Sequence, residues 1–253
     1  MGLPSRPAVC RFLPAVSASL AWVFALVLAL PAAGTTLPDP AAPGLPPHDR
    51  LAALVERVKG EQQRLHSLEA EFEQHKESAF LALPQDSRGV FSFVAPDQVR
   101  WEYLAPRQIS LVISGEEMTT WFHDLNRVDR MKIGRYSNQV LKYLNASSSL
   151  DTLLRYFSVD LHYTATGNEP YRLELSPRYQ RVAKRVRAMT LWIDRTLFLP
   201  TRVRYVEGDG DVTEYRFQRL RVNGTVPEHR FTLDLPASVE VRILDLDRGF
   251  AAQ

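Results

Sequence analysis

Most of this chain is a succession of short segments in which apolar and polar residues alternate. In the first of them, Leu68 to His75, Leu68, Ala70 and Phe72 fall on one side and three glutamates on the other, the pattern of a half-buried strand. Turn signals separate successive segments by only a few residues. Because parallel strands need crossovers of a dozen or more residues, this spacing favours sequential antiparallel hairpins.

A single sheet of about a dozen strands usually curls, because strand twist accumulates and free edges are a liability. We therefore predict a mainly β fold with a few helices: an incomplete antiparallel β-barrel, or half-barrel, with helices across its open side. The expected strands are Leu68–His75, Ser87–Val94, Gln98–Tyr103, Gln108–Ser114, Met118–His123, Val128–Ile133, Val159–Thr164, Tyr171–Ser176, Ala188–Ile193, Thr201–Val206, Val212–Val222 and Phe231–Leu233.

Helical periodicity replaces the alternation in a few places. Apolar residues between Leu51 and Val58 recur at helical spacing behind a possible Asp49 cap, which predicts a helix that ends near Gly60 or a few residues later. Two short helices are expected to interrupt the sheet, at 136–144 and at 150–157.

The N-terminal segment has the order of a secretory signal. Arg6 and Arg11 precede an uncharged, largely apolar run, and small residues close this run at Gly34. An uncleaved membrane anchor is the alternative, but Pro14 shortens the run and no cationic stop follows it. We expect residues 1–34 to be a signal peptide that is cleaved near Gly34.

Two further parts of the chain follow the expected signal. Residues 35–47 hold five prolines, a density that favours extended and solvated backbone, so we expect a linker there. Residues 48–250 show neither an internal repeat nor a break in composition. They are expected to form a single domain.

Charge and cysteine content exclude several classes of function. The chain has 31 Lys and Arg against 29 Asp and Glu, and Arg6 and Arg11 lie in the expected signal, so the remaining charges balance. We therefore expect no nucleic-acid partner recruited by bulk charge. The only cysteine, Cys10, lies in the same signal. A mature protein without a thiol has no disulfide, cysteine nucleophile or thiolate zinc site.

Motifs of the common enzyme classes do not occur in the sequence. The six histidines are dispersed without metal-ligand spacing, so we expect no metal, no cofactor and no catalysis. His123 followed by Asp124 leaves open an alternative of a different class, an exported hydrolase. The acidic run from Glu207 to Asp211 lacks the spacing of a calcium loop and is expected to be a hairpin turn.

A basic patch interrupts the otherwise balanced charge. It consists of five cations within ten residues: Arg178, Arg181, Lys184, Arg185 and Arg187. A solvated loop or short helix between two strands is one interpretation. The other is a surface that docks an acidic partner or lipid headgroups.

The segment Gly89–Tyr103 consists of an aromatic strand, a Pro-Asp turn and a second aromatic strand. It resembles the hairpin of the LolA family, periplasmic carriers of outer-membrane lipoproteins. Leu68–Gln74, which ends in Phe-x-Gln, resembles the passage that leads from the opening helix into the first strand of this family. Ile109–Ser114 followed by 120–122 (Thr-Trp-Phe) resembles its isoleucine-rich strand and Leu-Trp-x-Tyr run. The resemblance covers about residues 50–240.

The resemblance implies a half-barrel covered by an α-helical lid, with an apolar cavity that shields acyl chains between an inner-membrane ABC transporter and an outer-membrane receptor. It implies a periplasmic, non-enzymatic carrier of lipoproteins or other acylated cargo, and we expect a monomer. The side chains expected to bind acyl chains are Phe91, Phe93, Val99, Trp101, Tyr103, Leu111, Ile113 and Trp121. Those expected in the lid are Leu141, Leu144, Leu150, Leu153, Leu154 and Phe157.

One departure from the family concerns the residue before the hairpin proline. The best-known carriers have an arginine there, which holds the lid closed, whereas this chain has Ala95. Arg100 is a candidate replacement, although we expect it to be an outward-facing strand arginine. The change favours a divergent relative, so a carrier or sensor for another lipid or glycolipid stays open as the alternative.

Overall fold

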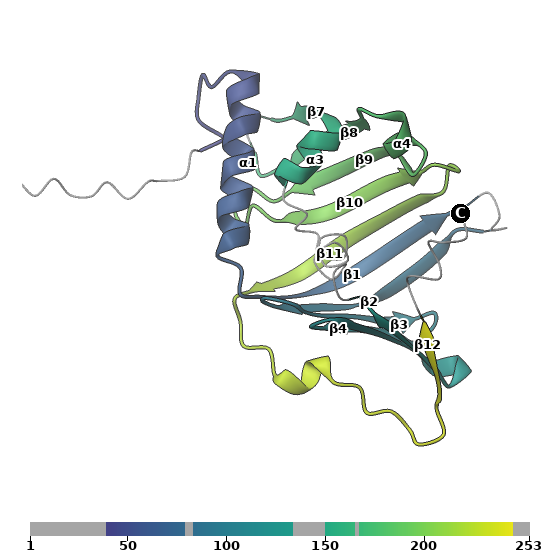
Figure 1. Cartoon of the computed structure of the whole chain (residues 1–253). Helices are drawn as coiled ribbons and strands as arrows, with labels where there is room; N and C mark the ends of the chain where they lie inside the picture. The colour runs from purple at the N-terminus through teal and green to yellow at the C-terminus, as the bar shows by residue number, and fades with distance from the viewer. Residues whose placement is uncertain (1–38, 79–82, 134–149, 165–166, 245–253) are drawn as a thin grey trace, which may run out of the picture. The chain divides into compact units, whose positions relative to one another are not determined.

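The twelve strands of the described chain form a single sheet. In this computed structural model the strand order is β12-β6-β5-β4-β3-β2-β1-β11-β10-β9-β8-β7 (Figure 1). The expected signal peptide, residues 1–34, and the expected helix 136–144 lie outside the described residues. The structure describes residues 39–78, 83–133, 150–164 and 167–244.

The strands are short and closely connected, as the alternation predicts. They are β1 (Ser67–Glu77), β2 (Gln85–Val94), β3 (Gln98–Ala105), β4 (Ile109–Ser114), β5 (Glu117–Phe122), β6 (Arg127–Lys132), β7 (Phe157–His162), β8 (Tyr171–Pro177), β9 (Val186–Ile193), β10 (Pro200–Glu207), β11 (Val212–Val222) and β12 (Glu240–Leu244). The helices are α1 (Pro47–Gln63), α3 (Leu150–Tyr156) and α4 (Gln180–Ala183), and two 3₁₀ turns are η1 (His123–Leu125) and η3 (Glu228–Phe231).

The sheet is antiparallel at every pairing except that of β12 with β6 within the described strands. β1 lies near the middle, where it pairs with β2 on one side and with β11 on the other. The outermost strands, β7 and β12, do not pair with each other in the described sheet. The predicted class is therefore confirmed: the fold is mainly β, has few helices, and its sheet stays open.

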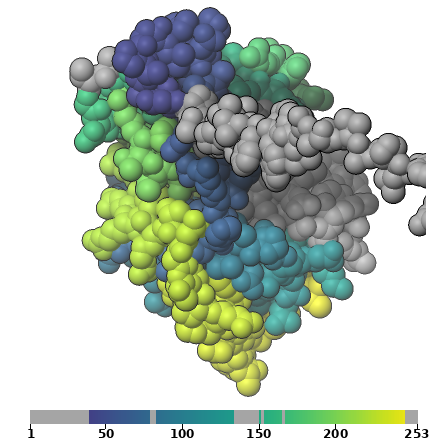
Figure 2. Space-filling view, turned by 90° about the vertical axis from the view of Figure 1, so that its left-hand side faces the viewer, coloured from purple at the N-terminus to yellow at the C-terminus, as the bar shows by residue number. Residues whose placement is uncertain are grey.

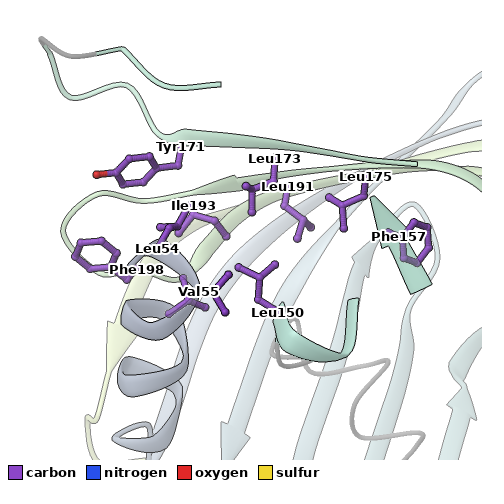
Figure 3. Close-up of a cluster of buried hydrophobic side chains, with 11 residues drawn as sticks. Leu54, Val55, Leu150, Phe157, Tyr171, Leu173, Leu175, Leu191, Ile193 and Phe198 are labelled. Carbon is purple, nitrogen blue, oxygen red and sulfur yellow. The ribbon is translucent and has the colours of Figure 1, made fainter. Parts of the chain in front are cut away.

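Helix α1 packs one apolar side against the β7–β10 half of the sheet. Pro47 occupies its first turn, where the missing N–H leaves no hydrogen bond unmade. Leu54, Val55 and Val58 are at most 5% exposed, and Figure 3 shows Leu54 and Val55 facing the strands. Each fully buried side chain of this kind contributes about 1.5–3 kcal/mol. We call this cluster the helix-covered core: Leu54, Val55, Val58, Leu150, Phe157, Tyr171, Leu173, Leu175, Leu191, Ile193 and Phe198.

The proline-rich segment differs from the expected solvated linker over the part that the structure describes. Arg50, which is 8% exposed, donates hydrogen bonds to the carbonyls of Pro40, of Ala42 at 3.3 Å and of Leu45 at 3.1 Å. Its guanidinium also lies 4.0 Å from the centre of the Tyr163 ring. A buried cation needs such partners, and here they fix residues 40–45 beside α1.

The C-terminal part contains two differences from the predicted strands. The expected strand Phe231–Leu233 is wrong, because residues 228–231 form the turn η3 and bury Phe231, which is 6% exposed. Packing against β3 and β4, not pairing, accounts for this apolar residue. Strand β12 was not predicted, since all five of its residues are exposed and show no buried side.

Two strand boundaries also need correction. β5 ends at Phe122, and the expected last strand residue, His123, begins a 3₁₀ turn that Asn126 closes with a φ of 46°. Phe157 was expected on a lid helix, but α3 ends one residue earlier and Phe157 opens β7. Its side chain is buried in the helix-covered core, so it is not a lid residue.

Candidate functional site

A second apolar cluster lines one face of β1–β4 and β11. Successive hairpin strands bring alternate residues to the same side of a sheet. The register sets Phe91 opposite Trp101, and Trp101 opposite Leu111. Phe93, Val99 and Ile113 form the next row in the same way. Three aromatic side chains from the neighbouring strands join them. We call this surface the aromatic face: Phe72, Phe91, Phe93, Val99, Trp101, Tyr103, Leu111, Ile113, Tyr215 and Phe217.

Trp101 is the centre of the aromatic face. Its ring centroid lies 4.8 Å from that of Phe91 and 4.9 Å from that of Phe72. The centroids of Tyr215 and Phe217 follow at 5.6 Å and 5.9 Å. Edge-to-face and tilted pairs of this kind add about 0.5–1.5 kcal/mol each beyond the area they bury. The rings therefore hold one another in place as a rigid apolar wall.

Gly89 provides the space that the Phe72 ring occupies. A Cβ at Gly89 would lie 2.6 Å from Cζ of Phe72 and 2.0 Å from the carbonyl oxygen of Glu102. Both distances are far below van der Waals contact. The hairpin that resembles the LolA family begins at this glycine, and its role here is to let β1 and β3 approach across β2.

The polar atoms near one end of the aromatic face satisfy one another. The Gln74 side-chain amide donates to the Tyr215 hydroxyl at 2.9 Å, and the hydroxyls of Tyr103 and Tyr215 lie 3.5 Å apart. Burial raises the pKa of both tyrosines, most strongly that of Tyr215. Their hydroxyls therefore stay neutral at physiological pH. The Nε1 of Trp101 is buried and has no hydrogen-bond partner among the described residues.

Seven of the eight residues predicted to bind acyl chains lie together on the aromatic face. Phe91, Phe93, Val99, Trp101 and Ile113 are 0–8% exposed, whereas Tyr103 and Leu111 are partly buried. Sequence reasoning missed the contributions of β1 and β11, namely Phe72, Tyr215 and Phe217. The alternation in β1 marks Phe72 as inward-facing, but no local signal pairs it with Phe217, which is its partner across the β1–β11 ladder.

Trp121 does not belong to the aromatic face. The register sets Trp121 opposite Ser110, while its neighbour Thr120 lies opposite Leu111. Trp121 therefore points to the other side of the sheet, where its ring stacks on that of His123 at 3.7 Å. The prediction that it contacts acyl chains together with Trp101 is wrong for this reason.

The C-terminal segment covers part of this opposite side. Arg100 donates hydrogen bonds to the carbonyl oxygens of Arg230 at 2.9 Å and Thr232 at 3.2 Å, and it pairs with Glu102 at 3.0 Å. Figure 2 shows the segment, in yellow, on the surface beside the strands coloured blue to teal. Arg100 thus faces outward, as expected, and it holds the C-terminal segment instead of a lid.

The residues behind the hydrolase alternative form a structural cluster. His123 Nε2 lies 3.0 Å from the Ser110 hydroxyl, a separation that a nucleophile and its base could have. However, Ser110 is only 1% exposed, and Asp124 pairs with Arg107 at 2.7 Å instead of orienting the imidazole. Burial lowers the pKa of His123. The geometry gives a substrate no access to the hydroxyl.

The candidate lid residues fall into two groups. Leu141 and Leu144 lie outside the described residues. Leu150 is buried in the helix-covered core, and Leu153 and Leu154 pack against that core. Helix α3 therefore contacts α1 and the β7–β10 half of the sheet. It has no assigned contact with the aromatic face among the described residues.

The search for other sites in the described part of the chain gave two results. No group of three or more His, Cys, Asp or Glu side chains is placed to hold a metal ion there. No helix among these residues has the length and apolar character that a membrane span requires.

Comparisons with known proteins agree with the resemblance in the hairpin. The chain is 24% identical over 190 residues to the outer-membrane lipoprotein carrier protein of Pseudomonas paraeruginosa, covering 75% of this chain and 88% of that one. It is 24% identical over 193 residues to the carrier of the same name from Chromohalobacter salexigens, covering 76% and 85%.

Solved structures include a conserved protein from Thermus thermophilus, with 13% identity and a TM-score of 0.49 over 77% of this chain and 99% of that one. The model of the family described as outer membrane lipoprotein carrier protein LolA matches residues 63–234. This match spans the aromatic hairpin, both of its neighbouring strands and most of the sheet. The chain belongs to the LolA family.

Proposed function

We propose that this protein is a periplasmic carrier that holds the acyl chains of lipoproteins against the aromatic face and shuttles them from the inner to the outer membrane. The observation that carries the proposal is the continuous apolar surface across β1–β4 and β11. Its hydroxyls are kept neutral by burial. A surface of this kind accepts hydrocarbon without directional bonds, so it suits cargo with chains of different length.

The free energy of hydration explains why such cargo needs a carrier. Each buried methylene group is worth about 0.8 kcal/mol, so a sixteen-carbon chain exposed to water costs about 10 kcal/mol or more. Free diffusion across an aqueous compartment is then negligible. The carrier must replace much of this burial and yet release its cargo, which favours a site that opens and closes.

The proposed route requires partners at both membranes. In this proposal an inner-membrane ABC transporter loads the carrier and an outer-membrane receptor unloads it, and the segment 1–34 directs export. Ala95 replaces the arginine of the best-known carriers. This departure supports a second candidate within the same family, a carrier or sensor of another lipid or glycolipid.

Photo-crosslinking in intact cells tests the proposal and separates these candidates. A photoreactive amino acid is placed at Leu111, which is partly buried on the aromatic face. The matched control carries it at Trp121, which lies on the opposite side of the neighbouring strand. Mass spectrometry identifies the adducts after illumination.

We expect lipoprotein adducts from position 111 and none from position 121. A free lipid or glycolipid at position 111 would assign the protein to the second candidate. Equal labelling at both positions, or no adduct from a folded and exported protein, would show that the aromatic face is closed core and would overturn the acyl-carrier proposal.

A further inference from the structure

The basic patch lies on the connection between β8 and β9, which contains the short helix α4. Figure 1 shows α4 beside the ends of these strands. All five of its cations are exposed. The connection is the surface feature that the proposed carrier function leaves unused. The five cations are Arg178, Arg181, Lys184, Arg185 and Arg187.

The charge of the basic patch is not compensated by the protein. None of its five cations forms an ion pair with a carboxylate of the described residues, whereas arginines elsewhere on the sheet do. Arg202 and Arg216 share Glu214 at 2.8 Å and 2.7 Å. The nearby hairpin turn carries Asp209, but its carboxylate accepts a hydrogen bond from a backbone N–H of the same turn.

Backbone contacts hold the basic patch in a fixed position. The N–H of Gly208, in the β10–β11 turn, donates to the Arg185 carbonyl at 2.9 Å. A Cβ at Gly208 would lie 1.7 Å from the Lys184 carbonyl oxygen, so the two turns are in direct contact. Arg178 donates from its backbone N–H to Tyr156 at 2.8 Å and from Nε to the Phe157 carbonyl at 2.9 Å. The cations thus extend from a rigid base.

Two exposed tyrosines accompany the cations. Tyr156 is 41% exposed and Tyr179 is 48% exposed. Tyr156 is joined to the patch by the hydrogen bond from Arg178, and the guanidinium of Arg181 lies 5.6 Å from the centre of the Tyr179 ring. Tyrosine prefers the interface between water and lipid. Clustered Lys and Arg are attracted to anionic lipid headgroups.

We propose that the basic patch, with Tyr156 and Tyr179, docks this protein on membranes that contain anionic phospholipids. The chain as a whole has a formal net charge of only +2, so attraction to such a membrane depends on this local cluster. Exposed cations and aromatic rings on one rigid connection fit a planar headgroup layer. An acidic partner protein provides no reason for the exposed rings. This docking surface does not depend on the identity of the cargo.

Sedimentation with vesicles tests the docking surface. Full-length mature protein is mixed with vesicles of phosphatidylcholine alone or with phosphatidylglycerol added at one part in four. The patch variant combines Arg181→Ser, Lys184→Ser and Arg185→Ser, which spares the hydrogen-bonded Arg178. The control variant removes the same charge at three other exposed cations: Arg88→Ser, Lys132→Ser and Arg242→Ser. Circular dichroism and thermal unfolding verify that both variants fold.

We expect the natural protein to bind the anionic vesicles, to bind less as salt is raised, and to ignore the neutral ones. The patch variant should bind at least tenfold more weakly, and the control should bind normally. Tyr179→Ser should weaken binding several-fold at unchanged charge. Equal losses in the two triple variants, equal binding to neutral vesicles, or no binding by the natural protein would overturn the proposal. None of these outcomes depends on whether the aromatic face binds acyl chains.

Discussion

The two apolar clusters of this protein are built differently. The helix-covered core joins side chains from α1 and α3 to those of β7–β10, so helix and sheet bury each other. The aromatic face draws mainly on one side of neighbouring strands and is dominated by rings that contact one another. The comparison indicates a division of labour, in which one cluster stabilises the domain and the other offers a preformed wall to a ligand.

The largest expected effect separates stability from binding at the helix-covered core. Leu54 is fully buried there, and Leu54→Ala should lower the free energy of unfolding by about 2–5 kcal/mol. Acyl binding by the folded fraction should be unchanged. Chemical denaturation and binding of a fluorescent fatty acid measure the two quantities. A loss of binding in the folded variant would contradict the proposed division.

A substitution at Gly89 probes how tightly the aromatic face is packed. Gly89→Ala places a methyl group against the Phe72 ring and the Glu102 carbonyl, so we expect a loss of about 1–3 kcal/mol in unfolding free energy. Gly224→Ala is the control, since a Cβ there meets nothing within 4 Å. Thermal unfolding compares the two. Equal melting temperatures would mean that β1 and β3 are not in close contact.

A polar residue on the aromatic face should affect binding more than stability. Leu111→Gln puts an amide among apolar side chains, and we expect about a tenfold weaker affinity for a fatty-acid probe, equivalent to about 1.4 kcal/mol. Trp121→Gln, on the opposite side of the sheet, should leave the affinity unchanged. Fluorescence titration gives both values. If the second substitution had the larger effect on affinity, the ligand side would be misassigned.

The smallest expected effect concerns the Tyr215 hydroxyl. Tyr215→Phe removes hydrogen bonds to Gln74 and Tyr103, which should cost about 0.5–1.5 kcal/mol at neutral pH. Burial raises the pKa of Tyr215 in the folded protein, so only the unfolded chain ionises as the pH passes its ordinary value. Its contribution to stability is complete below that pH and decreases above it.

Denaturation curves measured at several pH values between neutral and alkaline test this sign. The natural protein should lose stability more steeply in the alkaline range than Tyr215→Phe. Tyr179→Phe, at an exposed position, is the control. Identical slopes for Tyr215→Phe and the natural protein would show that the hydroxyl is open to solvent when the protein is folded.

Local pattern was enough to predict most elements and the hairpin part of the site. Alternation identified β1–β11, and helical spacing identified the buried side of α1. The side on which Trp121 lies could not be predicted in this way, because β5 has apolar residues on both of its sides. Its orientation follows from pairing with β4. Phe72 and Phe217 likewise meet through a pairing between distant parts of the chain.

The β1–β11 pairing also has a consequence for the order of folding. The strands β2–β6 and β7–β10 can form hairpins as they emerge, but β1 finds its second partner only after Val212–Val222 has been made. Contacts between residues so far apart in sequence slow folding. Until that ladder closes, β1 presents an unpaired edge that other chains can join. A nascent or truncated chain ending before β11 should therefore depend on chaperones to avoid aggregation.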